Sequence, residues 1–165
     1  MQLVFNDEQN RLTPEMRELM QKAADEAFRT EFTDELDIES IENEPETGVT
    51  VVDDNTIREL NRDYRGNDSV TDVLSFPQFE GHADLLEDLS DDELATLIGD
   101  VVICHEQALR QAEEYGTGIT REMLYLFVHS MMHLFGYDHM EEDEKAVMRA
   151  REEEVLSLIG VGRGK

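Results

Sequence analysis

The chain has 165 residues, of which 39% are hydrophobic, and its formal net charge is −26. This length suits one compact domain over residues 1–165 and is short for two ordinary ones. The negative charge repels phosphate backbones, so it argues against a protein that coats nucleic acid regardless of sequence. Screening confines that repulsion to about 8 to 10 Å at cellular salt, which still allows a local basic cleft or docking onto a protein already on RNA.

Membrane and redox signals point to a cytoplasmic protein. No segment approaches the ~18 to 20 consecutive apolar residues that a membrane span needs, and the chain does not open on a basic region followed by an apolar run. The single cysteine, Cys104, excludes an internal disulfide framework and fits a reducing compartment. We therefore expect no membrane partner, and any metal site must be built from histidines and carboxylates.

Local patterns in the first half of the chain favour short strands and two helices. Thr13 before Pro14 is a helix-start signal, and the apolar residues after it recur at spacings of three and four. A β-branched run and a second apolar run that stops at Pro77 are typical of strands. The expected elements are a strand at 2–5, a helix at 14–32, strands at 36–41 and 49–52, a helix at 53–64 and a strand at 70–76.

The second half is predicted to be mainly helical. Residues 78–89 are expected to form a loop, and Ser90 with Glu93 makes a capping-box pattern for a short helix. The expected elements after this loop are a helix from 90 to about 99, a strand at 101–104 and helices at 105–115, 120–135 and 141–159. The whole pattern predicts an α+β fold, a single domain in which helices pack on a small mixed β-sheet and one helix carries histidines.

Three of the five histidines lie close together, at positions 129, 133 and 139. His129 and His133 are four residues apart in a predicted helix, so they project from one face about 6 Å apart along the axis. Gly136 allows the helix to stop in a left-handed turn, after which His139 can return toward the other two. Three imidazoles leave a fourth tetrahedral position for water, as in a catalytic metal site.

The composition around these histidines favours zinc, at one ion per chain. Neutral imidazole also suits copper, nickel or iron, but no cysteine or dense carboxylate set stands beside the three rings. The competing interpretation is a set of ordinary core or surface histidines. Three buried imidazoles would each need their own hydrogen-bond partners, whereas one shared metal satisfies all of them. Asp138 fits either a group that orients a ligand or a simple turn residue.

The spacing H-x-x-x-H-x-x-G-x-x-H is also that of the metzincin peptidases. Those enzymes place a glutamate directly after the first histidine as general base, and Ser130 occupies that position here. Serine cannot accept that proton near neutral pH, and the chain leaves little room for a peptide-binding subdomain. A metzincin-like metallopeptidase is therefore the weaker alternative.

Residues 129–139 read HSMMHLFGYDH, which more closely resembles the YbeY family of bacterial rRNA maturation endoribonucleases. The family signature is roughly H-G-x-L-H-L-x-G-Y-D-H, from which Ser130 and Met132 depart. Two further blocks resemble the family in the same order, so the resemblance covers about residue 50 to the end. These blocks are Leu60-Asn61 with Tyr64-Arg65-Gly66 and residues 71–77 (TDVLSFP), and residues 99–103 (GDVVI).

The resemblance implies a zinc site of His129, His133 and His139, an α+β fold, and a role in processing ribosomal RNA with ribosome-associated partners. Arg65 matches a family position. In chemical terms, zinc can activate water or a 2′-hydroxyl near a phosphodiester, and a nearby cation would stabilise charge on the phosphoryl oxygens. The competing interpretation of Arg65 is a solvated loop residue or a salt bridge to the abundant acid.

Other candidate residues receive structural interpretations. Thr71, Asp72 and Ser75 either shape the cleft beside Arg65 or cap a strand. We expect His82 and His105 on the surface and Cys104 packed on a strand.

Two functions from different classes follow from these patterns. The first is a zinc-dependent endoribonuclease acting in ribosomal RNA maturation and ribosome quality control. The second is a zinc-stabilised ribosome-assembly adaptor that binds proteins and cuts nothing, which an acidic surface would suit. Metal removal discriminates between them, because a domain that depends on a structural metal unfolds without it.

Overall fold

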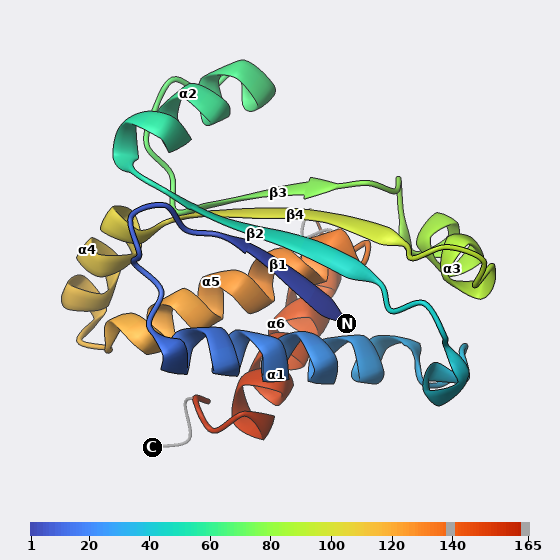
Figure 1. Ribbon diagram of the computed structural model, residues 1–165. Helices are drawn as coiled ribbons and strands as arrows, with labels where there is room; N and C mark the ends of the chain where they lie inside the picture. The colour runs from blue at the N-terminus through green and yellow to red at the C-terminus, as the bar shows by residue number, and fades with distance from the viewer. Residues whose placement is uncertain (138–140, 163–165) are drawn as a thin grey trace.

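The computed structural model describes residues 1–137 and 141–162. Helices cover one face of a four-stranded sheet, and a single helix, α2, stands over the other face (Figure 1). The elements in chain order are β1 (Gln2–Asn6), α1 (Pro14–Phe32), the short 3-10 helix η1 (Ile38–Ser40), β2 (Glu46–Val52), α2 (Asp54–Arg65), β3 (Val73–Pro77), α3 (His82–Ser90), β4 (Leu97–Cys104), α4 (His105–Tyr115), α5 (Ile119–Leu134) and α6 (Glu142–Leu158).

The sheet has the strand order β1-β2-β4-β3 and is mixed. β1 pairs parallel with β2, and β2 pairs parallel with β4, whereas β3 pairs antiparallel with β4. Parallel neighbours require a crossover connection, which α1 supplies between β1 and β2. The predicted α+β class with a small mixed sheet is therefore confirmed.

Helix α5 lies at the centre of the main core. It packs against β3, β4, α1, α4 and α6, and its buried side chains cover most of its circumference, including Met123, Leu124, Phe127, Val128 and Met131. A helix buried on nearly all sides is held in one position by its neighbours. Side chains on its remaining open face are therefore presented from a rigid support.

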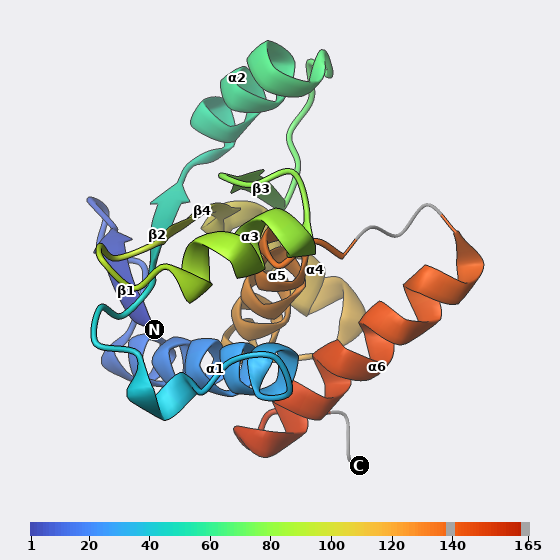
Figure 2. The same cartoon turned by 90° about the vertical axis from the view of Figure 1, so that its right-hand side faces the viewer.

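Helix α2 covers the other face of the sheet through a small second cluster of Ile57, Leu74, Val102 and Cys104. The Asp53 side chain caps its first turn by accepting a hydrogen bond from the Thr56 N–H at 2.9 Å. Gly66 ends the helix with a left-handed φ of 69°. Figure 2 shows α2 standing above the sheet, on the side away from α5.

Three predicted elements are wrong, and each error has a packing reason. Residues 36–41 form a turn and η1 rather than a strand, and their apolar side chains pack against the core from that turn. Residues 78–89 contain helix α3, which buries Leu85 and Leu89, four residues apart, beneath an acidic outer face. The predicted helix from residue 90 does not form, because Ser90 is the last residue of α3, its hydroxyl donates back to the Leu86 carbonyl, and β4 begins at Leu97.

Within the described residues, no helix has the length and apolar character needed to cross a bilayer.

Candidate metal centre

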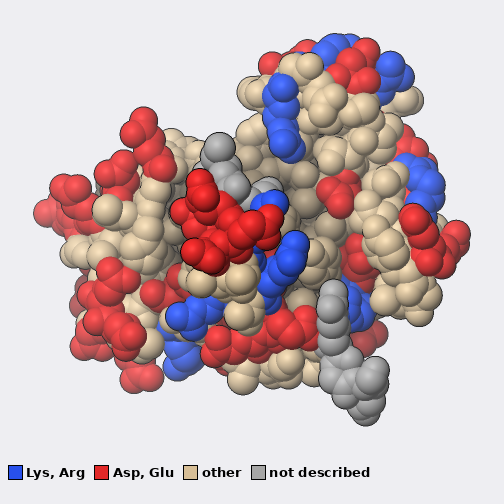
Figure 3. All heavy atoms as spheres, turned by 180° about the vertical axis from the view of Figure 1, so that it is seen from behind, with Lys and Arg blue, Asp and Glu red and all other residues tan. Residues whose placement is uncertain are grey.

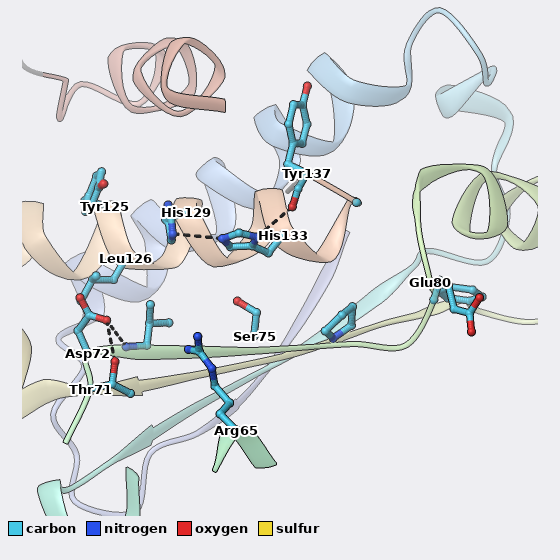
Figure 4. A pocket seen from close by; sticks show the side chains of 14 residues that line it. Arg65, Thr71, Asp72, Ser75, Glu80, Tyr125, Leu126, His129, His133 and Tyr137 are labelled. Atoms are coloured by element: carbon cyan, nitrogen blue, oxygen red, sulfur yellow. Dashed lines mark hydrogen bonds between the residues drawn. The ribbon is translucent and has the colours of Figure 1, made fainter. Parts of the chain in front are cut away.

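His129 and His133 project from the open face of α5 into a cavity of about 570 Å³. Their Nε2 atoms lie 3.3 Å apart, and the two rings are nearly perpendicular, with an interplanar angle of 84° (Figure 4). The predicted helical pair is thus brought together, one turn apart. His139, the third predicted ligand, and Asp138 lie outside the described residues.

Each ring is oriented by an acceptor at its other nitrogen. His129 Nδ1 lies 2.9 Å from Glu152 Oε2, and His133 Nδ1 lies 2.9 Å from the Tyr137 carbonyl oxygen. A carboxylate and a carbonyl can only accept, so both Nδ1 atoms donate. In the neutral rings, each Nε2 therefore carries a lone pair rather than a hydrogen, the form in which an imidazole binds a metal through this atom.

The nitrogen separation fits one tetrahedral zinc ion. Two imidazole ligands about 2.0 to 2.1 Å from zinc are separated by about 3.3 to 3.4 Å at the tetrahedral angle, and the observed Nε2 separation is 3.3 Å. Among the described residues, no group of three or more histidine, cysteine, aspartate or glutamate side chains could hold a metal. The spacing of the described pair is thus compatible with two of the three ligands that the sequence predicts.

The turn after α5 places the Tyr137 carbonyl oxygen within hydrogen-bonding distance of His133 Nδ1. Gly136 has a φ of 107°, and a Cβ atom there would lie 2.6 Å from the His82 backbone nitrogen, so glycine is required. His82 stacks on Phe32 with ring centroids 4.9 Å apart and bonds to Glu35 at 2.8 Å. His82 thus lies at the surface as expected, with its side chain 36% exposed, and it packs one ring face against Phe32 of α1.

The same turn and α6 are anchored to α1. The Tyr137 hydroxyl donates to Glu31 Oε1 at 2.8 Å, and Arg151 Nε lies 3.8 Å from that oxygen. Burial, and then the neighbouring Glu31 carboxylate, raise the pKa of Tyr137 to about 12. Arg151 precedes Glu152 on α6, so neighbouring residues of one helix fix both the turn and the His129 ring.

Ser130, the residue that replaces the metzincin glutamate, is fully buried. Its hydroxyl lies 2.7 Å from that of Ser75, which joins α5 to β3 behind the histidines. Ser75 also lines the cavity, so it contributes to the cleft wall as expected. Ser130 is a packing residue of the α5–β3 contact.

Arg65 lines the same cavity from the end of α2, opposite the two histidines (Figure 4). The part of the chain described by the structure offers its side chain no hydrogen bond or ion pair. Arg58 and Arg62, on the same helix, bond to Asp68 and Asp63 at 2.8 and 3.1 Å. Arg65 thus differs from its helix neighbours in facing the cleft without an internal carboxylate partner.

Asp72 combines the two roles expected for it. Its Oδ1 accepts a hydrogen bond from the Val73 N–H at 2.7 Å at the start of β3, and its Oδ2 lies 3.3 Å from Gln111 Nε2. The residue also lines the cavity together with Thr71. It is therefore both a strand cap and a part of the cleft wall.

The other two candidates lie at the junction of β4 and α4. Cys104 is buried as expected, and that burial raises the pKa of its thiol to about 12. His105 is half-buried rather than on the surface, and its Nδ1 has no hydrogen-bond partner among the described residues. Neither residue lines the histidine cavity.

Comparisons with known proteins identify the family. The family model described as "Endoribonuclease YbeY" matches residues 5–160. The chain belongs to the endoribonuclease YbeY family. It is 47% identical over 131 residues to "Endoribonuclease YbeY" of Thermoanaerobacter sp. (strain X514), which covers 78% of this chain and 82% of that protein. It is 39% identical over 166 residues to the protein of the same name from Lysinibacillus sphaericus, over 96% of each chain.

A solved structure supports the fold alone. The solution structure of TM1509 from Thermotoga maritima matches with a TM-score of 0.59 and 22% sequence identity, over 94% of this chain and 90% of that one. The α+β architecture is thus that of a known fold.

Sequence reasoning missed the groups that orient the histidines of this YbeY family member. Glu152 lies on another helix, amid a run of glutamates, and is only 3% exposed. The sequence offered one signal of this role, which is the position of Glu152 on the helix. It falls on the face of α6 that also carries the buried Met148, Val155 and Leu156. Tyr137 contributes a backbone carbonyl, which no side-chain motif reveals.

Glu152→Ala should weaken zinc binding by about 10- to 100-fold, the usual loss when a group that orients a histidine ligand is removed. Glu152→Gln should lose less, because the amide oxygen still accepts from His129 Nδ1. The affinities are measured by competition with a chromophoric chelator. Glu154→Ala, which removes an exposed neighbour whose one partner among the described residues is Arg151 at 3.4 Å, is the control and should bind zinc normally. If the Glu152 variants bound zinc as tightly as wild type, Glu152 would not be needed to orient His129.

Proposed function

We propose that the protein is a zinc-dependent endoribonuclease that acts in ribosomal RNA maturation and ribosome quality control. Its metal is one zinc ion per chain, held by His129, His133 and His139. Its partners are ribosomal RNA and ribosome-associated proteins in the cytoplasm. The observation that carries the proposal is that Arg65 faces the paired histidine nitrogens across one cavity, in a chain of the endoribonuclease YbeY family.

The residues of the cleft have complementary tasks in phosphodiester cleavage. When bound, zinc supplies a Lewis acid that activates water and polarises a phosphoryl oxygen at neutral pH. Glu152 and the Tyr137 carbonyl hold the histidine rings in the tautomer that binds metal through Nε2. The Arg65 guanidinium binds phosphoryl oxygens from the opposite wall and neutralises the charge that grows on them.

The distribution of charge makes an RNA substrate compatible with a net charge of −26. Figure 3 shows acidic side chains over much of one face, with lysine and arginine side chains interspersed among them, including on the projecting lobe that α2 forms. Arg65 is the only lysine or arginine among the described residues that line the cavity. A phosphate entering this cleft therefore meets a placed cation near the histidines.

The test is cleavage of structured ribosomal RNA fragments by purified, zinc-loaded protein. Chelation should abolish cleavage and added zinc should restore it, while circular dichroism shows the same folded domain. The fold should survive because α5 is held by its apolar core and the histidines lie on its open face. A protein that cuts no RNA and unfolds when zinc is removed would instead be the zinc-stabilised adaptor, which the acidic surface favours.

Metal-loaded protein should not cleave unstructured casein. The metzincin general base is replaced by Ser130, whose buried hydroxyl is bonded to Ser75 and cannot take a proton from water. Casein fragments are followed by gel electrophoresis, with His133→Ala as the control for contaminating protease. Cleavage that disappears in His133→Ala would contradict this prediction.

A further inference from the structure

A second cavity, of about 800 Å³, lies beside the histidine cavity and shares two wall residues with it, Asp72 and Tyr125. The two cavities are therefore neighbours, with these two side chains at their boundary. The remaining lining residues are Gln111, Tyr115, Thr117, Arg121, Glu122, Glu153 and Gly162.

Helix α5 forms the floor of both hollows. Arg121, Tyr125, His129 and His133 follow one another at intervals of four residues, so they form one stripe along the helix. The first two line the second cavity and the last two line the histidine cavity, with Tyr125 between. The stripe from Arg121 to His129 spans two turns, or about 12 Å. A strand lying at the histidines would therefore reach the second cavity within a short distance.

Two aromatic rings bound the second cavity. Tyr115, the last residue of α4, is 64% exposed, and Tyr125 is half-buried with its ring stacked on His129 at 6.0 Å between centroids. Tyrosine faces of this kind are the platforms on which single-stranded nucleic acids stack their bases.

The polar lining suits a base better than a phosphate. Gln111 Nε2 lies 3.0 Å from Glu122 Oε2 and 3.3 Å from Asp72 Oδ2, which joins two carboxyl groups across the cavity wall. Glu122 is 4% exposed, and burial raises its pKa. Arg121 also lines the cavity, but the carboxylates of Asp72 and Glu153 outnumber this one cation and disfavour phosphate, whereas carboxylate oxygens accept hydrogen bonds from the amino groups of bases. Thr117 Oγ1 is buried without a hydrogen-bond partner among the described residues, and a base edge could supply one.

We propose that this second cavity is a nucleobase subsite, which stacks an unpaired base of the RNA substrate on Tyr115 and Tyr125 and selects bases that carry an amino group. The inference rests on the proposed endoribonuclease function, because it places that base in the same strand as the phosphodiester at the histidines. The stacked base lies on one side of the cleaved bond.

The first experiment pairs base removal with Tyr115→Ala. An RNA oligonucleotide that zinc-loaded protein cleaves at one bond is resynthesised with an abasic nucleotide at each position in turn. Wild-type kcat/KM should fall on the order of tenfold at one position on one side of the cleaved bond, the loss expected for one stacked base. Tyr115→Ala should show a similar loss on the intact oligonucleotide and little further loss on that abasic one. Leu109→Ala, an exposed apolar residue of the same helix outside both cavities, should match wild type.

Additive losses from Tyr115→Ala and from the abasic nucleotide, or no loss from either, would overturn the subsite. Cytosine at the sensitive position should be cleaved faster than uracil, and equal rates would overturn the selection of an amino group. Equilibrium binding of the same oligonucleotides to chelator-treated protein, followed by fluorescence anisotropy, separates this inference from the proposed function. If no RNA were cleaved, the enzyme proposal would fail. The binding measurements would still show whether Tyr115→Ala and removal of one base weaken RNA binding through the same contact.

Discussion

His133→Ala should remove most of the bound zinc and abolish RNA cleavage while the domain stays folded. His133 supplies one of the two Nε2 atoms that lie 3.3 Å apart, so the variant loses a third of the proposed protein ligands. The variant should keep its fold, because the ring is half-buried on the cavity wall and not part of the apolar core. Elemental analysis of purified protein should give about one zinc per wild-type chain and far less in the variant.

His105→Ala is the matched control, since it removes a half-buried imidazole that does not line the cavity. It should retain zinc and activity. His129→Ala and His139→Ala should behave as His133→Ala does. If all three variants kept a full equivalent of zinc, the three-histidine site would be wrong, whatever the family suggests.

The fold was predictable wherever a local pattern coincides with a cap. Thr13 accepts a hydrogen bond from the Met16 N–H at 3.1 Å, and α1 spans Pro14–Phe32 as the pattern predicts. Residues 36–41 show the opposite case, because alternation there arises from a turn that points apolar side chains at the core. Strand pairing also lay beyond a single sequence, since β4 lies between β2 and β3 through contacts distant in the chain.

The site residues could be predicted from the sequence only where they lie on the same helix. The four-residue spacing of His129 and His133 needs nothing but a helix, and the structure brings these rings together. Glu152 comes from α6, and Arg65 lines the cavity from the last residue of α2. Those positions depend on how helices pack, which sequence spacing does not encode. The resemblance indicated Arg65, and only the structure shows that it faces the histidines.

Arg65→Ala should reduce RNA cleavage at least a hundredfold while leaving zinc content and thermal unfolding unchanged. Losing one charge-assisted contact to a transition-state oxyanion costs about 2.7 to 4 kcal/mol, which corresponds to this loss in rate. No other lysine or arginine among the described lining residues could compensate. Folding should be unaffected, because the exposed Arg65 side chain makes no hydrogen bond or ion pair within the described part of the chain.

Arg65→Lys tests the geometry of the contact apart from its charge. Lysine keeps the positive charge but lacks the planar pair of donors that binds two phosphoryl oxygens at once, so it should also be impaired, though less than alanine. Arg62→Ala is the matched control, because Arg62 lies on the same helix, bonds to Asp63 at 3.1 Å and does not line the cavity. Rates are measured on one RNA fragment at fixed ionic strength, because salt screens exposed charges. If Arg65→Ala were slow only because the protein had lost one positive charge, Arg62→Ala would be slowed equally. A wild-type rate for Arg65→Ala would exclude the phosphate contact, and loss of zinc or a lowered Tm would make Arg65 a structural residue.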